Sequence, residues 1–500
     1  MAREALEADV KRGIEDLLDQ APDGYPRVGE PDPRWYWAAP LYFDKYLAHR
    51  LVPSIKGSLV HAMEGWSTAI DRGEDIEKGD EPASLRRHID AALSVRQTRR
   101  GTHVVVQVGD GPLGPRPPDL AQVLTQFAIA GPGVCAIRAL SRVAGGPGAM
   151  VDPAIRERAY QIAHGLRTLF RKREIGAVLG AGAVRHYWRE VLKHGMDGCL
   201  QAVLDEYTHV LVESEGLQDI DPYDPDLGQD NARQRAERIA RVFRSALRYQ
   251  PVPNNVTDVQ VAADGVVLSS QSVSTFFAAK FGRIGSGTYD DAVRTAFNSP
   301  FRPFVLASTS VGQEGLDFHT YCHAIVHWNL PSNPVDLEQR EGRIHRYKGH
   351  AVRKNIAAEY SWAVPVWEMD DPWEAMFDAA RSDRPAAADD IWPYWVFTRP
   401  EGAVIERYVP AMPLSREIQQ YRRLSRTLGA YRLVMGQPRQ PDLMKYLRDA
   451  DVDVSWLGID LSPTEAVRPS HDEQAGGGVH RLEDAERSPA ERLDSFAPEQ

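Results

Sequence analysis

The sequence predicts an α/β protein: a lobe built on a parallel sheet, preceded and followed by mostly helical regions. Up to about residue 250 the apolar residues recur mainly at helical spacing, whereas from Val256 onward short apolar runs alternate with helical segments. Strands that alternate with helices at this spacing are typical of a parallel sheet with crossover helices. The length of 500 residues, 43% of them hydrophobic, leaves room for about three domains and their cores.

Composition and charge exclude several classes of protein. No apolar run approaches the roughly 18 residues that a membrane helix needs, and the charged N-terminus has no signal-peptide core. The cysteines, Cys135, Cys199 and Cys322, lie too far apart for a disulfide framework or a CxxC metal site. We therefore expect a cytoplasmic protein that has no contact with a membrane and holds no metal itself. The formal net charge of −11 is weak evidence against a nucleic-acid partner, because residues 461–500 alone contain nine acids and four bases.

Residues 1–250 are predicted to form a mostly helical region of unassigned function. Apolar residues from Leu6 to Leu18 repeat at helical spacing, and turn residues at 21–24 end this first helix. Further helices are expected at Ser54–Asp71, Ser84–Val95, Leu120–Phe127, Asp152–Phe170, Ala181–Lys193, Leu200–Leu211 and Asn231–Leu247. One strand is expected, at His103–Val108. The arginines just before it (Arg96, Arg99 and Arg100) either form a solvated surface or follow a phosphate backbone.

Residues 251–370 are predicted to form the parallel-sheet lobe. Its apolar and helical runs alternate in the order Gly265–Leu268, Val273–Phe281, Asp290–Phe297, Phe304–Ala307, Ala324–Trp328, Asp336–Arg343 and Ile356–Val364. Residues 371–460 follow as a tryptophan-rich helical brace, in which Ser415 caps a long helix that Gly436 and Pro438 end. Residues 461–500, with three consecutive glycines and scattered charge, are expected to be a disordered tail.

The polar loop after the expected strand Phe304–Ala307 is the first candidate binding feature. It reads STSVGQEGLD and runs from Ser308 to Asp317. Open α/β sheets bind ligands at loops of this kind, where a parallel strand ends. Gly315 allows a tight backbone, and Asp317 offers an acceptor to a ribose hydroxyl or to an arginine. An ordinary connection between a strand and a helix is the alternative.

Guanidinium groups gather on the helix expected at 336–343, which Asn333 can cap and Pro334 can open. Gln339, Arg343 and Arg346 are spaced i, i+4 and i+7 and so share one helix face, with Arg340 beside them. The planar fork of arginine matches phosphate oxygens, which favours an anion site. Because glutamates are interleaved at 338 and 341, a solvated charged face is the alternative.

Together the two segments closely resemble motifs V and VI of superfamily-two helicases and translocases, and most closely those of the Swi/Snf-type group. The residues that carry the resemblance are LPSNP at 330–334, QREGRIHR at 339–346, and Arg294 with Phe297 and Asn298 upstream. The stretch VVLSSQSVSTFF (266–277) is a weak match to motif IV, and the whole resemblance covers about Val256 to Val366. The helical first region and the segment 414–443 are loosely similar to helicase-like proteins of bacterial phage-defence islands.

The resemblance implies a RecA-like second helicase lobe and the hydrolysis of ATP coupled to movement on DNA. Arg343 and Arg346 would be arginine fingers, which reach the γ-phosphate and stabilise charge on the transferring phosphoryl group. Contacts with the nucleotide would come from Gln339, Arg340, Gly315 and Asp317. Ser308 and Thr309 would lie near the backbone of the nucleic-acid strand.

The sequence departs from the helicase pattern because it lacks the motifs of the first lobe. It contains neither a GxxxxGK[ST] phosphate loop nor a DExx motif in a position suited to hold Mg²⁺. Asp205-Glu206 falls on a predicted helix with no phosphate loop before it. We therefore expect ATP and Mg²⁺ to be held by a separate polypeptide that carries the first lobe, and the chain to act as a helicase-type ATPase only with it. The alternative is a non-catalytic scaffold, derived from a helicase lobe, that binds nucleic acid or protein.

Overall fold

The computed structural model describes residues 3–22, 29–47, 90–178, 187–216, 228–251, 254–262, 265–273, 275–282, 287–308, 317–364, 371–385, 388, 391–411 and 413–434. Met1–Leu428 forms one compact unit, and Gly429–Gln500 forms a second, of which only the end of one helix is described. Several predictions lie outside the described residues: the helix at Ser54–Asp71, most of the helix at Ser84–Val95, the loop residues Thr309 and Gly315, and the tail at 461–500.

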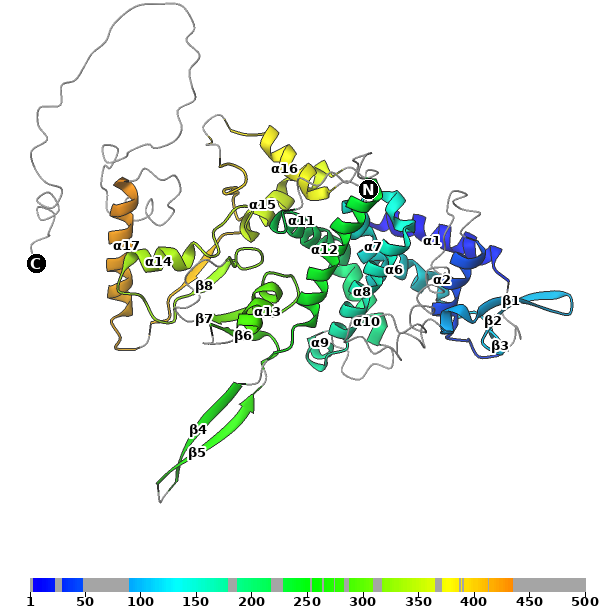
Figure 1. Ribbon diagram of the computed structural model, residues 1–500, viewed down its shortest axis with the longest axis horizontal. Helices are drawn as coiled ribbons and strands as arrows, with labels where there is room; N and C mark the ends of the chain where they lie inside the picture. Colours follow the sequence, from blue (N-terminus) through cyan, green and yellow to red (C-terminus); the bar gives the residue numbers. More distant parts are fainter. Residues whose placement is uncertain are drawn as a thin grey trace, which may run out of the picture. The chain divides into compact units, whose positions relative to one another are not determined.

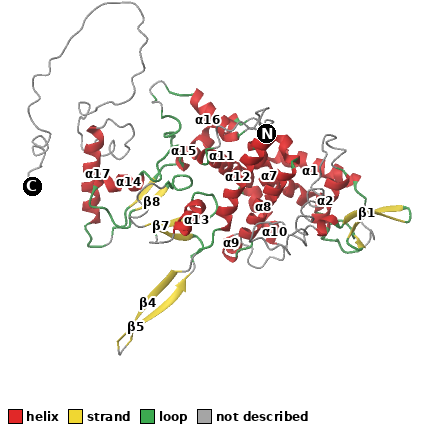
Figure 2. Cartoon of the chain, viewed as in Figure 1, coloured by secondary structure: helices red, strands yellow, loops and turns green. Residues whose placement is uncertain are grey.

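The first half of the described chain is mostly helical, as predicted (Figures 1 and 2). The helices are α1 (Arg3–Gln20), α2 (Trp35–Tyr46), α6 (Leu120–Ala130), α7 (Pro132–Val143), α8 (Pro153–Phe170), α9 (Arg173–Val178), α10 (Tyr187–Asp197), α11 (Leu200–Ser214) and α12 (Gly228–Arg248). Helices α6, α8, α11 and α12 confirm four of the predicted helices; α6, α11 and α12 are longer than predicted, and Asp152 is the N-cap of α8. Helix α7 was not predicted. Its sequence opens with Gly131-Pro132-Gly133, which is typical of a turn, but proline is also tolerated at the first position of a helix, where it lies here.

Helices α7, α8, α11 and α12 share one apolar core, which contains Leu140, Ile162, Tyr207 and Phe243. Helix α8 is well defined at its start, where the Asp152 side chain accepts a hydrogen bond of 2.8 Å from the backbone N–H of Ala154 and proline takes the first helical position. Further along α8, Gly165 allows α12 to come close: a Cβ there would lie only 2.8 Å from the Leu247 side chain. The four helices therefore form a tightly packed body.

Contrary to the expectation that no apolar stretch reaches the length of a membrane helix, Leu120–Val143 is long and apolar enough by composition to cross a membrane. In the structure it comprises two helices, α6 and α7, with Gly131 between them. Leu124 of α6 and Leu140 of α7 are buried in two different apolar cores. Core helices that are buried on most sides have this composition too. The cytoplasmic location and the lack of membrane contact stay predictions.

A second, smaller core joins α1, α2 and α6 to a short antiparallel sheet. The sheet consists of β1 (Val95–Arg100), β2 (His103–Val108) and β3 (Gly111–Pro112), and β2 confirms the strand predicted at these residues. Arg100 pairs with His103 at the tip of the β1–β2 hairpin, where Gly101 takes a φ of +60° that suits glycine. Trp35 is fully buried in this core beside Val95 and Val106.

The lobe combines helices with small parallel sheets, which confirms the α/β prediction in part. Strand β6 (Ala278–Phe281) pairs in parallel with β7 (Val305–Ser308), and α13 (Gly287–Phe297) crosses between them. Strand β8 (Ala324–Val326) pairs in parallel with β9 (Glu406–Tyr408). The remaining helices are α14 (Pro334–Glu341), α15 (His350–Tyr360), α16 (Pro372–Ser382) and α17 (Glu417–Val434). The described strands therefore form separate two-stranded sheets where the sequence predicted a single one.

Two strand predictions in the lobe were wrong in detail. The residues that resemble motif IV (266–277) lie mostly in β5 (Gly265–Val273), which forms an antiparallel hairpin with β4 (Asn254–Ala262), away from the parallel strands (Figure 1). The strand predicted at Phe304–Ala307 exists as β7, but it is not buried: Phe304 is 59% exposed and Val305 is 60% exposed. An apolar run alone does not show whether both faces of its sheet are covered, and among the described strands β7 pairs with β6 alone.

We expect Asp205 in α11 to make the stability of the protein depend on pH. Its carboxylate is buried, 3.2 Å from the Arg142 guanidinium, and burial raises its pKa from 3.8 to about 6. A raised pKa means that the folded state favours the protonated acid, so stability falls by about 3 kcal/mol as the pH rises from 4 through 6. Urea unfolding of wild type and Asp205→Asn at several pH values measures this effect. Parallel stability curves for the two proteins would contradict it.

Candidate functional site

Helix α14 places the arginine-rich segment, and it begins as the sequence predicts. The Asn333 side chain accepts a hydrogen bond of 2.9 Å from the backbone N–H of Val335, and Pro334 takes the first helical position. The end differs from the prediction. The helix stops at Glu341, whose partly buried carboxylate binds the guanidinium of Arg407 in β9 and lies 3.2 Å from His327 Nε2.

The early end of α14 changes where the arginines lie. Arg343 and Arg346 belong to a loop, 342–349, so the prediction that they share one helix face with Gln339 was wrong. Glycine at position 342 favours this end, since it costs a helix interior roughly 1 kcal/mol relative to alanine. The Arg343 carbonyl then accepts a hydrogen bond of 2.9 Å from the backbone N–H of Phe318. This bond joins the loop to the segment that contains Asp317.

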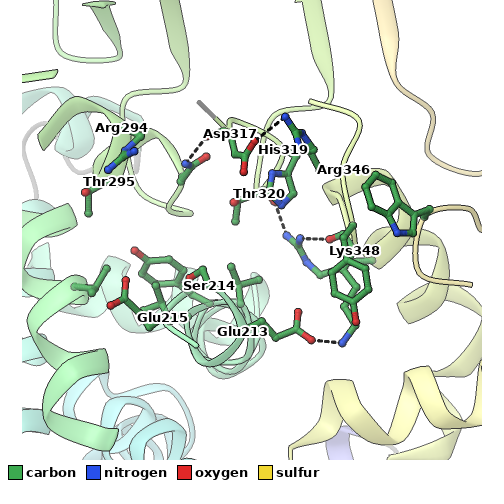
Figure 3. A pocket seen from close by; sticks show the side chains of 18 residues that line it. Glu213, Ser214, Glu215, Arg294, Thr295, Asp317, His319, Thr320, Arg346 and Lys348 are labelled. Atoms are coloured by element: carbon green, nitrogen blue, oxygen red, sulfur yellow. Dashed lines mark hydrogen bonds and ion pairs between the residues drawn. The ribbon is translucent and has the colours of Figure 1, made fainter. Parts of the chain in front are cut away.

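Two predicted site residues, Arg346 and Asp317, are brought together by this arrangement (Figure 3). Arg346 Nη2 lies 3.2 Å from Asp317 Oδ1, and Arg346 Nε donates a hydrogen bond of 3.0 Å to the carbonyl of Gly342. Both side chains are about half exposed. The Arg346 guanidinium is therefore held in one direction by the chain itself and still faces solvent, as a group that binds an anion must.

A pocket of about 630 Å³ lies beside this pair, between α11, α13 and the loops 317–320 and 346–348. Its charged and polar lining comes from Glu213, Ser214, Glu215, Arg294, Thr295, Asn298, Asp317, His319, Thr320, Arg346, Lys348 and Arg353. Burial lowers the pKa of His319 to about 4, so this ring is neutral at pH 7. The pocket therefore presents several cations together with the acidic last turn of α11.

Other predicted site residues lie elsewhere. Gln339 is exposed on α14, and Arg340 Nη1 donates a hydrogen bond of 2.9 Å to the carbonyl of Asn329. Ser308 is exposed at the end of β7, while Thr309 and Gly315 fall outside the described residues. Among the described lining residues of the pocket, Gln339, Arg340, Arg343 and Ser308 do not occur. The structure thus brings together only part of the predicted constellation.

Sequence reasoning missed a buried group of charges below the pocket. His209 Nδ1 lies 2.6 Å from Asp371 Oδ2, and His209 Nε2 lies 3.5 Å from Lys348 Nζ. Lys348 also forms an ion pair with Glu213. Burial alone would raise the pKa of Asp371, but the charge and hydrogen bond of His209 hold it below its usual value. The group joins α11 and α16, which are far apart in sequence, so no local pattern could have revealed it.

Arg353 makes a second buried connection to α11. Its guanidinium is almost fully buried and donates hydrogen bonds to Glu206 Oε1 at 2.9 Å, to the carbonyl of Lys348 at 2.7 Å and to the carbonyl of Thr320 at 2.5 Å. Asp205 and Glu206, the DE pair of the sequence, are therefore partners of Arg142 and Arg353 on a helix. This agrees with the view that they are not magnesium ligands.

The residues present do not fit a bound Mg²⁺. Within the part of the chain that the structure describes, no group of three or more His, Cys, Asp and Glu side chains could hold a metal ion. Carboxylates and waters are the ligands that Mg²⁺ prefers, and each described carboxylate of the pocket has a cation beside it: Arg346 lies next to Asp317, Lys348 next to Glu213, and Arg238 at 3.8 Å from Glu215.

Comparison with protein families places this site in context. The model of the helicase conserved C-terminal domain matches residues 287–348, from the start of α13 to Lys348 in the loop 342–349 that contains Arg343 and Arg346. No curated protein and no solved structure matches the chain. The matched residues contain Arg294, Asp317, Arg343 and Arg346, so the pocket is lined in part by residues that match this domain and in part by α11, which lies outside the match.

Proposed function

We propose that this chain supplies the second lobe of a Swi/Snf-type, ATP-dependent DNA translocase or helicase. The observation that carries the proposal is the pair Arg346–Asp317 at the edge of a pocket, within the residues that match the helicase C-terminal domain. The lobe would contribute arginine fingers and part of the DNA track. The phosphate loop and the magnesium ligands would come from a separate first lobe, which also completes the ATP site.

Arg346 is suited to such a role by its exposure and its present partner. A half-exposed ion pair is worth little, on the order of 1 kcal/mol or less, so the guanidinium can exchange Asp317 for a phosphate at small cost. On a phosphoryl group its planar fork would stabilise the charge that develops on the equatorial oxygens. Arg343, three residues earlier in the same loop, would be the second finger.

A non-catalytic scaffold is the second candidate, and one observation favours it. The pocket beside Arg346 is closed on one side by the last turn of α11, where Glu213 and Glu215 lie. Carboxylates at this position repel a triphosphate, and Glu213 already neutralises Lys348. In this reading the helicase lobe is held permanently against the helical region and serves to bind a nucleic acid or a protein.

ATP turnover in the presence of DNA distinguishes the two candidates. We expect the purified chain to hydrolyse no ATP by itself. We expect turnover when it is mixed with the product of the neighbouring upstream reading frame, provided that frame encodes GxxxxGK[ST] followed by DExx. Robust turnover by the chain alone, abolished by Arg346→Ala, would refute the need for a separate first lobe. An upstream frame without these motifs, or an inactive mixture, would favour the scaffold.

A further inference from the structure

We infer that the N-terminal region carries a binding site for single-stranded nucleic acid, separate from the helicase lobe. The site consists of an aromatic groove and the arginine-bearing hairpin β1–β2. The groove has a volume of about 680 Å³ and is lined by Pro31, Pro33, Tyr36, Trp37, Pro117, Pro118, Asp119, Phe127, Trp188 and Arg189. These residues come from α2, α6, α10 and the loops before α2 and α6, all of them outside the residues that match the helicase domain.

The groove is built from aromatic rings that contact one another. The ring centroids of Tyr36 and Trp188 lie 5.5 Å apart, and those of Phe127 and Trp188 lie 5.7 Å apart with nearly parallel planes. Trp37, on the first turn of α2, lines the groove and is 39% exposed. An indole that lines a cavity and remains this exposed offers a large flat surface on which another ring can stack.

The polar groups of the groove are already neutralised, which restricts the ligand. Arg189 lies against both Tyr36 and Trp188, at 5.0 and 4.9 Å from the ring centroids, and occupies the position that a cationic ligand would take. Asp119 accepts hydrogen bonds from Arg189 at 2.7 Å and from the Tyr36 hydroxyl at 2.5 Å. A ligand of this groove must therefore be recognised through the faces of its rings, as nucleobases are.

The neighbouring hairpin supplies the charge that a nucleic-acid strand requires. Residues 95–108 contain Arg96, Arg99 and Arg100 and no acidic residue, and all three arginines are exposed. This contrasts with the net charge of −11 of the whole chain. The chain thus combines an aromatic groove with exposed arginines on the hairpin that leads into it. Proteins hold single strands with these two components: the rings stack the bases, and the cations follow the phosphates.

The groove and the hairpin are connected rigidly. The chain passes from β2 through β3 directly into Pro117 and Pro118 of the groove. Two hydrogen bonds of Gly114 fix this connection to the start of α2. Trp35 Nε1 donates one of 2.8 Å to the carbonyl of Gly114, and the backbone N–H of Gly114 donates one of 2.8 Å to the Asp32 carboxylate. Sites placed on rigid elements bind with less loss of entropy, since little has to be ordered on binding.

The test measures the anisotropy of fluorescently labelled (dT)20 and (rU)20 titrated with the full chain, without ATP. We expect binding of the single strand that exceeds binding of a duplex of equal length, because a duplex hides the faces of its bases. The DNA and RNA arms show which sugar is preferred. Trp37→Ala is expected to weaken binding about tenfold or more, and Arg99→Ala with Arg100→Ala is expected to reduce the dependence on salt concentration.

Trp362→Ala is the matched control. Trp362 is 72% exposed, lies in the short 3-10 helix Ser361–Ala363 and does not line the groove. The arginine variants change only exposed side chains, so they test the inference even if Trp37→Ala does not fold. Any of three results would overturn the inference. The variants could all bind with equal affinity, the chain could bind duplex and single strand equally well, or it could prefer a labelled proline decapeptide to both oligonucleotides. Because the assay contains no ATP, its result does not depend on the proposed ATPase.

Discussion

Arg346→Ala is expected to lower ATP turnover by about 10³-fold or more when the first lobe is present. The reason is the position of the guanidinium, which lies at the edge of the pocket and is held by Asp317 and by the Gly342 carbonyl. Loss of a cation that stabilises the transferring phosphoryl group raises the barrier of the chemical step and not the affinity for ATP. We therefore expect kcat to fall while KM changes little, measured with a coupled assay for ADP release.

Two further variants make this result specific. Arg346→Lys is expected to restore little activity, because an ammonium group lacks the planar fork that binds two phosphate oxygens. Arg381→Ala, an exposed position in α16, is expected to leave turnover unchanged. The half-exposed pair with Asp317 contributes little to stability, so Arg346→Ala is expected to fold normally. Unchanged turnover of Arg346→Ala would contradict the role of Arg346. So would a loss of turnover that is fully explained by a smaller amount of folded protein.

Arg353→Met is expected to destabilise the protein by about 3–5 kcal/mol. The guanidinium of Arg353 is almost completely buried and makes hydrogen bonds to Glu206, Lys348 and Thr320. Its removal leaves the carboxylate of Glu206 without a cation and two backbone carbonyls without donors, and each unsatisfied group costs free energy. Thermal and urea unfolding of the full chain measure the effect.

The control for Arg353 is Arg381→Met, which removes an exposed guanidinium from an i, i+3 ion pair. We expect its stability to change by about 0.5 kcal/mol or less. A double variant, Arg353→Met with Glu206→Gln, tests whether the unpaired carboxylate causes the loss: it should be more stable than Arg353→Met alone. A loss no greater than that of the control would show that the buried connection contributes little.

The parts of the structure that depend on local sequence could be predicted. Asn333 and Pro334 start α14 as expected, and β2 occupies the predicted residues, because caps and alternating apolar residues act over a few positions. The sequence offered Asp317 as an acceptor for a ribose hydroxyl or an arginine, and in the structure it pairs with Arg346. Gly342 favours the early end of α14, but the contact of Glu341 with Arg407, 66 residues later in the chain, could not be predicted.

The remaining differences have the same physical origin. The exposure of β7 depends on which elements cover its sheet, and β9 pairs with β8 across about 80 residues. The buried group of Lys348, His209 and Asp371 combines three segments, and its members look like ordinary surface residues in the sequence. The aromatic groove likewise gathers side chains from α2, α6 and α10. Contacts between distant segments decide these features, and a single sequence does not reveal them.

The two buried connections to α11 have a mechanical consequence. Arg353 and Lys348 both join α11 to the segment that contains Arg346, and α11 packs in the core of α7, α8 and α12. A displacement of the loop 342–349 is therefore expected to move α11, together with the helices α7, α8 and α12 that pack against it. Binding of a ligand at Arg346 would in this way affect the N-terminal half of the chain as well, through the ion pairs Lys348–Glu213 and Arg353–Glu206.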